Sequence, residues 1–257
     1  MWRRIRIAVL LLILLFVALN TYFDRVYSTD WNSALRVAVY PINGDGSEES
    51  ERFLARLKAD DFRAIESFFE SEAQDYGLTM QRPIHMLLGP RIRELPPILP
   101  PDAGVLGTAW WSLRARYWAW RMAEPPDGFG TDIQLFVLYH DPNRSPALPH
   151  SVGLRKGLFG IVNVFADARM MGSNDVVIAH ELLHTLGASD KYDPTTGQPL
   201  YPAGYAEPDR EPLHPQEYAE LMGGRIPLGE DRAETPVSLR DVLIGPETAA
   251  EIGWIEE

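Results

Sequence analysis

The sequence contains no cysteine, and this absence excludes several kinds of structure at once. Without cysteine the chain forms no disulfide bond, holds no zinc–thiolate site, and cannot use a thiol to keep an active site latent. If the protein is kept latent, another device does it. The absence leaves the cellular compartment open, because many extracytoplasmic bacterial proteins also lack cysteine.

Basic residues are few relative to acidic ones. The 257 residues include 24 Lys and Arg against 36 Asp and Glu, which gives a net charge of −12. This charge favours solubility and disfavours nucleic acid or an anionic surface as the partner, so we expect no nucleic-acid binding. With 46% apolar residues the chain can bury one substantial core, and one compact unit is the simplest arrangement.

Long apolar runs are scarce, and the longest lies near the N-terminus. Three arginines among the first six residues precede an apolar run over residues 7–19 that extends to Phe23. As a helix, residues 5–23 would span roughly 28 Å, close to the thickness of a bilayer core. The arginines favour a cytoplasmic N-terminus, with the rest of the chain outside the cytoplasm.

We therefore expect residues 1–24 to form a single-pass anchor in the cell inner membrane, which makes the membrane a partner of the chain. Residues 25–34 would be a tether to a periplasmic domain. The uninterrupted apolar core is short for a membrane span, so a cleaved signal peptide and a secreted protein are the alternative. Residues 18–20 match a cleavage site poorly, which favours the anchor.

The most specific pattern in the chain is the H-E-x-x-H sequence formed by His180, Glu181 and His184. Two histidines four residues apart on a helix lie on one face, one turn apart, so both imidazoles can reach a single metal ion. The glutamate lies beside that ion, where it can accept a proton from a metal-bound water. Gly187 is expected to end the helix with a left-handed residue, which places Asp190 as a third ligand.

A zinc ion with three protein ligands keeps one position open for water, as catalytic zinc sites do. We expect Zn2+ to be the cofactor, with His180, His184 and Asp190 as its ligands. His214 is the main rival to Asp190 for the third position. Four glutamates downstream of the motif are further candidates for that position: Glu207, Glu211, Glu217 and Glu220.

These residues resemble the metzincin metallopeptidases, whose signature H-E-x-x-H-x-x-G-x-x-H ends in a histidine where this chain has Asp190. Aspartate at this place, followed by Tyr192, is similar to the snapalysin branch of small bacterial metzincins. Residues 219–224, AELMGG, resemble the Met-turn, with Met222 as the methionine beneath the metal. Two features depart from the family pattern: a long insertion between Tyr192 and Tyr218, and Gly224 where many metzincins have a tyrosine.

The resemblance implies an α+β, metzincin-like fold. Its parts are a twisted, mostly parallel five-stranded sheet with one antiparallel edge strand, an active-site helix and a small irregular C-terminal lobe. Residues 35–257 would form the metallopeptidase domain, with an upper lobe over 35–187 and a lower lobe over 188–257.

Residue patterns locate most of the expected elements. Apolar runs predict strands over residues 35–40, 83–88, 132–139, 151–154 and 158–165. Helical spacing predicts helices over residues 47–74 and 107–123, the second with an aromatic cluster that we expect to pack in the core. The active-site helix is expected to begin near Asn174 with Ser173 or Asn174 as its cap, and a short helix is expected over residues 216–221.

The expected hairpin bears on substrate binding. By the resemblance, the strand over residues 151–154 would form the upper rim of a cleft and pair with an extended peptide through backbone hydrogen bonds. Gly153 would leave room for a second chain. The alternative is an ordinary edge strand protected by its neighbours. The residues assigned to substrate binding are Ser151, Val152, Gly153 and Leu154.

The sequence thus predicts a membrane-anchored, extracytoplasmic zinc metalloendopeptidase that acts on proteins or peptides. A zinc-bound water would attack the peptide bond, with Glu181 as the general base. Tyr192 is expected to stabilise the oxyanion or to hold Asp190, and Tyr218 could take the first of these roles. The alternative is an exported binding module without catalytic activity, built on a metallopeptidase scaffold.

Overall fold

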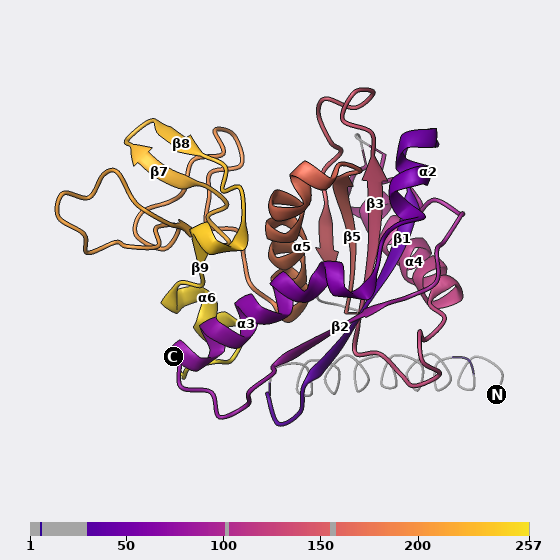
Figure 1. Cartoon of the computed structure of the whole chain (residues 1–257), viewed down its shortest axis with the longest axis horizontal. Coiled ribbons are helices and arrows are strands. Elements are labelled where there is room, and N and C mark those ends of the chain that lie inside the picture. The colour runs from indigo at the N-terminus through magenta and orange to yellow at the C-terminus, as the bar shows by residue number, and fades with distance from the viewer. Residues whose placement is uncertain (1–5, 7–29, 101–102, 155–157, 257) are drawn as a thin grey trace.

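A computed structural model describes residues 6, 30–100, 103–154 and 158–256 (Figure 1). The anchor expected over residues 1–24 falls outside these residues, apart from Arg6, as do residues 25–29 of the expected tether. Within the described part of the chain, no helix combines the length and the apolar character that crossing a bilayer requires.

A five-stranded sheet in the order β2-β1-β3-β5-β4 forms the centre of the fold (Figure 1). Four of its strands run parallel, and β4 pairs antiparallel with β5 at one edge, which confirms the expected mostly parallel sheet with a single antiparallel edge strand. The central strands are rich in β-branched and aromatic residues and are buried on both faces, as strands of parallel sheets are. The strands are β1 (Leu35–Asn43), β2 (Ile84–Leu88), β3 (Ile133–His140), β4 (Val152–Leu154) and β5 (Phe159–Phe165).

Helices cover both faces of the sheet. Alternate residues of β1 and β3 point to opposite sides: Val37 and Val137 join one apolar cluster with α3 and α5, whereas Tyr40 and Phe136 join another with α4. The first face carries the helices α2 (Glu48–Leu54), η1 (Ala59–Phe62), α3 (Arg63–Asp75) and α5 (Met171–Leu186), and the second carries α4 (Val105–Met122).

The single helix expected over residues 47–74 is wrong, because the chain interrupts it between α2 and η1. Ser47 caps α2, and its hydroxyl accepts a hydrogen bond from the Ser50 N–H at 3.0 Å. Lys58 then adopts an extended backbone, and its N–H donates to the Asp61 carboxylate at 2.7 Å. Asp61 therefore caps the start of a second helix. The helical spacing of apolar residues continues across the break, which is why the sequence predicted a single helix.

The aromatic cluster on α4 packs in the core only in part. Trp111 and Trp118 are buried against the sheet, as expected. Trp110, Tyr117 and Trp120 lie on the other side of the helix and are exposed, so the expectation is wrong for these three.

The C-terminal segment from residue 188 onward is mostly irregular and lies beside α5 (Figure 1). Its apolar residues, including Met222 and Ile252, belong to the same core cluster as α5. The short helix expected over residues 216–221 is wrong, because the Gln216 N–H donates to the Pro227 carbonyl at 2.8 Å instead of starting a helix. The elements here are β6 (Ala219–Glu220), β7 (Ile226–Gly229), β8 (Arg232–Glu234), η3 (Leu239–Asp241), β9 (Val242–Leu243) and α6 (Pro246–Glu251).

Candidate metal centre

The helix α5 carries the H-E-x-x-H motif and begins earlier than expected. It starts at Met171, after the short helix η2 (Ala168–Met170), so neither Ser173 nor Asn174 caps it. The Asn174 side chain instead bonds to the end of β5: it donates to the Phe165 carbonyl at 2.8 Å and accepts from the Phe165 N–H at 3.1 Å. This pair of hydrogen bonds fixes the position of α5 relative to the sheet.

Gly187 ends α5 in the left-handed conformation, with φ of 112°, as the sequence predicts. Its N–H donates to the carbonyls of Leu183 and His184, at 3.0 and 3.2 Å. A residue with a Cβ would be strained there. The chain turns back at this point and brings Asp190 to the histidine pair.

Three side-chain atoms from the motif and the bend lie close together. The Nε2 atoms of His180 and His184 are each 3.2 Å from Oδ1 of Asp190. The Nδ1 atoms of the two histidines face backbone carbonyls at 2.9 Å, those of Leu221 and Ala188 respectively. Because a carbonyl only accepts, each Nδ1 carries the proton in the neutral ring and leaves Nε2 free to bind a metal ion.

This spacing matches what a zinc ion requires. A tetrahedral zinc with ligand bonds of about 2.0–2.1 Å separates its ligand atoms by about 3.3 Å. His180, His184 and the neighbouring Glu181 also form a group that could hold a metal ion. Two carboxylates, those of Asp190 and Glu181, therefore accompany the histidines, and the fit of the donor set to one divalent cation is good.

The two carboxylates have opposite environments. Glu181 is buried, which raises the pKa of its carboxyl despite the nearby histidines, and its Oε2 has no hydrogen-bond partner within the described residues. Burial also acts on Asp190, but hydrogen bonds from His180 and His184 outweigh it and hold the pKa of that carboxyl well below its usual range. Asp190 is thus suited to act as a metal ligand that stays charged, and Glu181 is suited to accept and release a proton.

His184 responds in the complementary direction. Burial alone would lower its pKa, but hydrogen bonds to Asp190 and to the Ala188 carbonyl raise the pKa above its usual value. The opposite shifts of His184 and Asp190 agree with the 3.2 Å distance between His184 Nε2 and Asp190 Oδ1, at which a protonated imidazole and a carboxylate attract each other.

The edge strand β4 lies directly over α5. A Cβ built on Gly153 would lie 2.5 Å from both the Glu181 carbonyl oxygen and the His184 Cβ, so only glycine permits this approach. Within the part of the chain that the structure describes, β4 ends the sheet and pairs only with β5. Of the four residues expected to bind substrate, Gly153 therefore borders the candidate metal centre, whereas Val152 and Leu154 pack against the apolar cluster on the other face of the sheet. One edge of β4 lacks a partner strand among the described residues.

The Met-turn-like segment lies beneath the histidines. Met222 is fully buried, and its carbonyl accepts a hydrogen bond from the Lys191 N–H at 2.9 Å. The preceding carbonyl, of Leu221, is the one that faces His180. The turn therefore holds both a histidine of the motif and the backbone next to Asp190.

Glu220 has a structural role and not the ligand role that the sequence left open. It is fully buried and accepts hydrogen bonds from the Gly223 N–H at 2.7 Å, the Gly245 N–H at 3.1 Å and the Thr248 hydroxyl at 2.6 Å. Burial raises the pKa of this carboxyl, and the three donors act in the other direction. Glu220 thus ties the Met-turn-like segment to the start of α6.

The remaining candidates for the third position are engaged elsewhere. Nε2 of His214 lies 3.2 Å from the Tyr205 hydroxyl, and Glu207 and Glu217 both pair with Arg210. Glu211 is exposed. Among the described residues, the group that could hold a metal ion consists of His180, Glu181 and His184, so the choice of Asp190 rests on its 3.2 Å distances to both histidines.

Sequence reasoning missed the residues that hold the bend at Asp190. Glu251 of α6 accepts hydrogen bonds from the Ser189 N–H at 3.0 Å, the Ser189 hydroxyl at 2.5 Å and the Lys191 ammonium at 2.7 Å. Lys191 is a buried lysine. The residues on both sides of Asp190 are thereby fixed by one carboxylate, and no local pattern connects residues 60 positions apart.

Tyr192 lies at the border of the centre. Its ring centroid is 6.4 Å from that of His180, and it is half-buried. Burial first, and then the charge of Asp190, raise the pKa of its phenol, so it remains a donor. A Cβ built on Gly224 would lie 4.0 Å from the Tyr192 ring.

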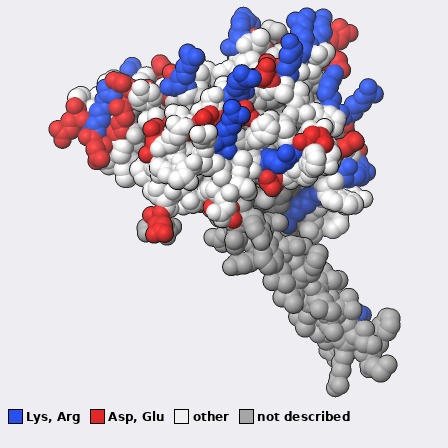
Figure 2. Space-filling view, turned by 60° about the horizontal axis from the view of Figure 1, so that its bottom comes forward, with Lys and Arg blue, Asp and Glu red and all other residues white. Residues whose placement is uncertain are grey.

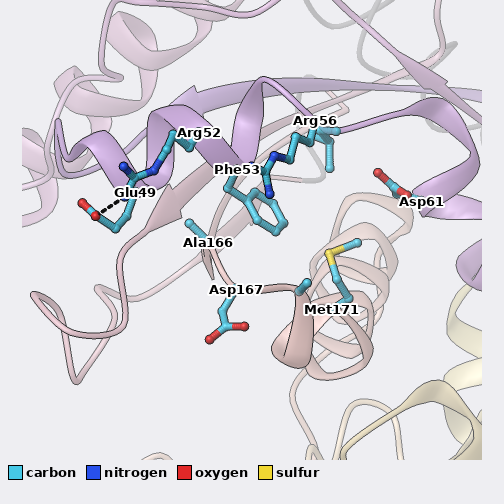
Figure 3. Close-up of a pocket in the computed structure, with 10 residues that line it drawn as sticks. Glu49, Arg52, Phe53, Arg56, Asp61, Ala166, Asp167 and Met171 are labelled. Carbon is cyan, nitrogen blue, oxygen red and sulfur yellow. Dashed lines mark hydrogen bonds and ion pairs between the residues drawn. The ribbon is translucent and has the colours of Figure 1, made fainter.

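A hollow of about 400 Å3 lies at the N-terminal end of α5 (Figure 3). Met171 and Phe53 line it, and the Glu49 and Arg52 side chains that border it pair with each other. Met171 is nine residues before His180, which is about 14 Å along the helix axis. This hollow is therefore separate from the candidate metal centre.

Comparison with known proteins adds no relative: no family model matches the chain, and no curated protein matches it.

Proposed function

We propose that the chain is a zinc-dependent metalloendopeptidase of metzincin-like fold. The observation that carries the proposal is the meeting of three potential ligand atoms, Nε2 of His180, Nε2 of His184 and Oδ1 of Asp190, at 3.2 Å. A buried and unpartnered carboxylate oxygen of Glu181 lies beside them. The edge strand above α5 and the buried Met222 below it add support, because both agree with the resemblance found in the sequence.

His180, His184 and Asp190 would hold the zinc ion. When bound, zinc would supply Lewis acidity to a substrate carbonyl and lower the pKa of water in the site. Asp190 brings one negative charge to the ligand set. Its exposed side chain, with 44% of the surface accessible, places the open side of the centre toward solvent, from which a peptide can approach.

Glu181 would act as the general base. Its Oε2 lies among buried groups without a hydrogen-bond partner, so it can accept a proton from an attacking water and return it to the leaving amine. A peptide added to the unpaired edge of β4 would be held extended by backbone hydrogen bonds, which do not require a particular side chain. The Tyr192 hydroxyl would donate to the oxyanion that develops on the substrate.

The N-terminal apolar run supports a location at the cell inner membrane with the catalytic domain in the periplasm. Secretion after cleavage is the alternative, and mass measurement of the mature protein distinguishes the two.

The central test uses the purified full chain. We expect bound zinc near one equivalent and cleavage of an unfolded protein that chelators abolish. Glu181→Gln should keep the zinc and lose at least about 100-fold in hydrolysis, because it removes the base and no ligand. Zinc without cleavage in the wild-type chain would favour the binding module.

The third ligand is tested separately. Asp190→Ala should release the zinc, because only two ligands remain. The control is Asp209→Ala, which removes an exposed aspartate elsewhere in the C-terminal segment and should leave the zinc content unchanged. If Asp190→Ala keeps its zinc, Asp190 is not the third ligand, and Glu181 becomes the candidate because it belongs to the same group that could hold a metal ion.

A further inference from the structure

The helix α4 has an exposed apolar stripe on the side that faces away from the sheet. The five residues follow one another at intervals of four, three, four and three, which aligns them along one side of a helix. Their exposed fractions range from 59 to 86%. The stripe consists of Leu106, Trp110, Leu113, Tyr117 and Trp120.

The sheet does not need these residues. Trp111, Ala115, Trp118 and Ala119 already bury the opposite side of α4 against the sheet. A helix with apolar residues on both sides is normally covered on both. Exposure of a second apolar side on this scale therefore indicates a binding surface.

Apolar residues next to α4 extend the stripe. The Trp111 indole donates to the Pro97 carbonyl at 2.7 Å, which holds the proline-rich segment before α4 against the start of the helix. Ile98 in this segment is 85% exposed, and Leu95 and Pro97 line one hollow together with Tyr117 of the stripe. Together the stripe and residues 95–99 form what we call the α4 surface.

The charge of α4 is opposite to that of the whole chain. The helix contains three arginines, Arg114, Arg116 and Arg121, and no acidic residue, although the net charge of the chain is −12. Much of the negative charge is in the C-terminal segment, where residues 188–256 include fourteen acidic and five basic side chains. Figure 2 shows acidic side chains gathered at the end of the molecule that contains β7 and β8.

The arginines lie along the borders of the stripe. Arg114 and Arg121 line a hollow of about 300 Å3 between α4 and the proline-rich segment, with Tyr117 and Leu95 beside them. Glu94 pairs with Arg121, and Arg114 makes no ion pair with any residue that the structure describes. The hollow thus offers a cation next to apolar and aromatic surface.

We propose that the α4 surface rests on the anionic face of a lipid bilayer, with Trp110, Tyr117 and Trp120 in the interface and Arg114 against lipid phosphate. Tryptophan and tyrosine prefer the level of the headgroups, and arginine at the border of an apolar stripe reaches phosphate while its stem stays in the apolar zone. Three arginines in 18 residues make α4 suited to lie on the surface and unsuited to cross it.

A bilayer fits these observations better than a protein partner. A second copy docked with its α4 parallel would bring the three arginines of one helix against those of the other. A second copy docked antiparallel would leave Arg114 without an anion on the facing helix, because α4 contains no acidic residue. Packing of residues 7–23 on the stripe would leave Arg114 without an anion, because that run contains no acidic residue. The overall acidity of the chain disfavours an anionic surface, but the α4 surface has the opposite charge and is the local exception.

The absence of cysteine makes a direct test possible, since a single introduced thiol can be labelled. Leu113→Cys places an environment-sensitive fluorophore in the stripe, and Val237→Cys, which replaces an exposed apolar residue far along the chain, is the matched control. The full chain is reconstituted into nanodiscs of phosphatidylcholine with phosphatidylglycerol, at one copy per disc, with spin-labelled lipid as the quencher.

We expect a blue shift and lipid quenching at position 113 and neither at position 237. Arg114→Gln should lower the ratio of docked to undocked label about fivefold on anionic discs and leave it unchanged on phosphatidylcholine alone. Equal near-ultraviolet circular dichroism across the variants shows that each has folded. Because quenching does not depend on metal or hydrolysis, this test is independent of the proposed function.

Three results would overturn the proposal. Equal quenching at positions 113 and 237 would mean that the label senses only proximity to the disc. Shielding of position 113 from aqueous iodide without lipid quenching would assign the surface to protein, either residues 7–23 or a second copy. Free access of iodide to position 113 in anionic discs would leave the α4 surface uncovered.

Discussion

The carboxylate of Glu251 should control metal affinity without contacting the metal. Glu251→Gln keeps the size of the side chain but removes the charge that faces Lys191 and weakens the bonds to Ser189. These two residues flank Asp190, so its carboxylate would lose the fixed position 3.2 Å from both histidines. Loss of a group that orients a metal ligand typically lowers metal affinity by about 10–100-fold.

The same substitution should also lower stability. The side chain of Lys191 is only 2% exposed and that of Glu251 is 25% exposed, so the pair is largely buried. Removing one partner of a fully buried ion pair costs about 3–5 kcal/mol. Glu251 is partly solvated and Glu247 stands 3.7 Å from the lysine, so we expect a smaller loss, about 1–3 kcal/mol.

The pH dependence of stability provides a second measure of this pair. Burial opposes ionisation of Glu251, but hydrogen bonds from Lys191 and Ser189 prevail and lower the pKa of its carboxyl. The contribution of this group is therefore complete above the ordinary glutamate pKa, about 4.3, and is lost as the pH falls through the lowered value. The stability of the Glu251→Gln chain should therefore fall less than that of the wild-type chain as the pH is lowered through this range.

The assay is titration of the metal-free full chain with Co2+, followed by the visible absorption of the ion, together with chemical unfolding. Glu247→Gln is the matched control, because this neighbouring carboxylate is 61% exposed and lies farther from Lys191. It should change neither quantity appreciably. Unchanged metal affinity in Glu251→Gln, with the expected loss of stability, would show that Glu251 supports the fold and does not position Asp190.

Two further predictions follow from close packing and from a buried charge. Gly153→Ala should cost about 1–3 kcal/mol of stability and weaken metal binding, because its Cβ would lie 2.5 Å from Glu181 and His184 atoms and must push β4 away; equal melting temperatures would contradict this packing. Asp175 is buried with Oδ1 unpartnered among the described residues, and burial followed by the charge of Asp61 raises its pKa to about 7. The unfolded carboxyl has a pKa near 3.9, so this group lowers stability as the pH rises from about 4 to 7. Asp175→Asn should thus stabilise the chain at pH 8, on the order of 2 kcal/mol, with little effect at pH 4; unfolding at the two pH values tests it, and equal effects at both would refute the assignment.

Local patterns accounted for the elements whose residues depend on near neighbours. The spacing of His180 and His184, and the need for glycine at position 187, are properties of a few consecutive residues, and the structure has the helix and its left-handed end there. The buried strands were also predictable, because parallel strands covered on both sides require continuous apolar runs. The order of the strands in the sheet depends on which strands pair, and an apolar run does not specify its neighbours.

Errors arose where a side chain has a distant partner. Asn174 resembles a helix cap in sequence, but its amide bonds to Phe165 at the end of β5, and the helix begins before it. Gln216 follows a proline that could start a helix, but its N–H donates to Pro227. In both cases a tertiary hydrogen bond replaces the local one that the pattern suggested.

The α4 helix shows a different limit of sequence reasoning. Aromatic residues on a helix usually pack in a core, and Trp111 and Trp118 do so. Trp110 and Trp120 lie on the other side of the helix, and the sequence does not tell whether another part of the chain packs against them. Only the exposure of these side chains in the folded structure separates residues that stabilise the fold from residues available for another surface.

The candidate centre is held by contacts from three separate parts of the chain. The helix α5 supplies the histidines, the Leu221 carbonyl orients His180, and the hydrogen bonds to Glu251 fix the bend at Asp190. Each support comes from the C-terminal segment, at 41 to 62 positions from its partner. A metal ion would then bind a site that folding has already ordered. Substitutions in α6 should therefore displace Asp190, through Glu251, more than they displace the histidines on α5.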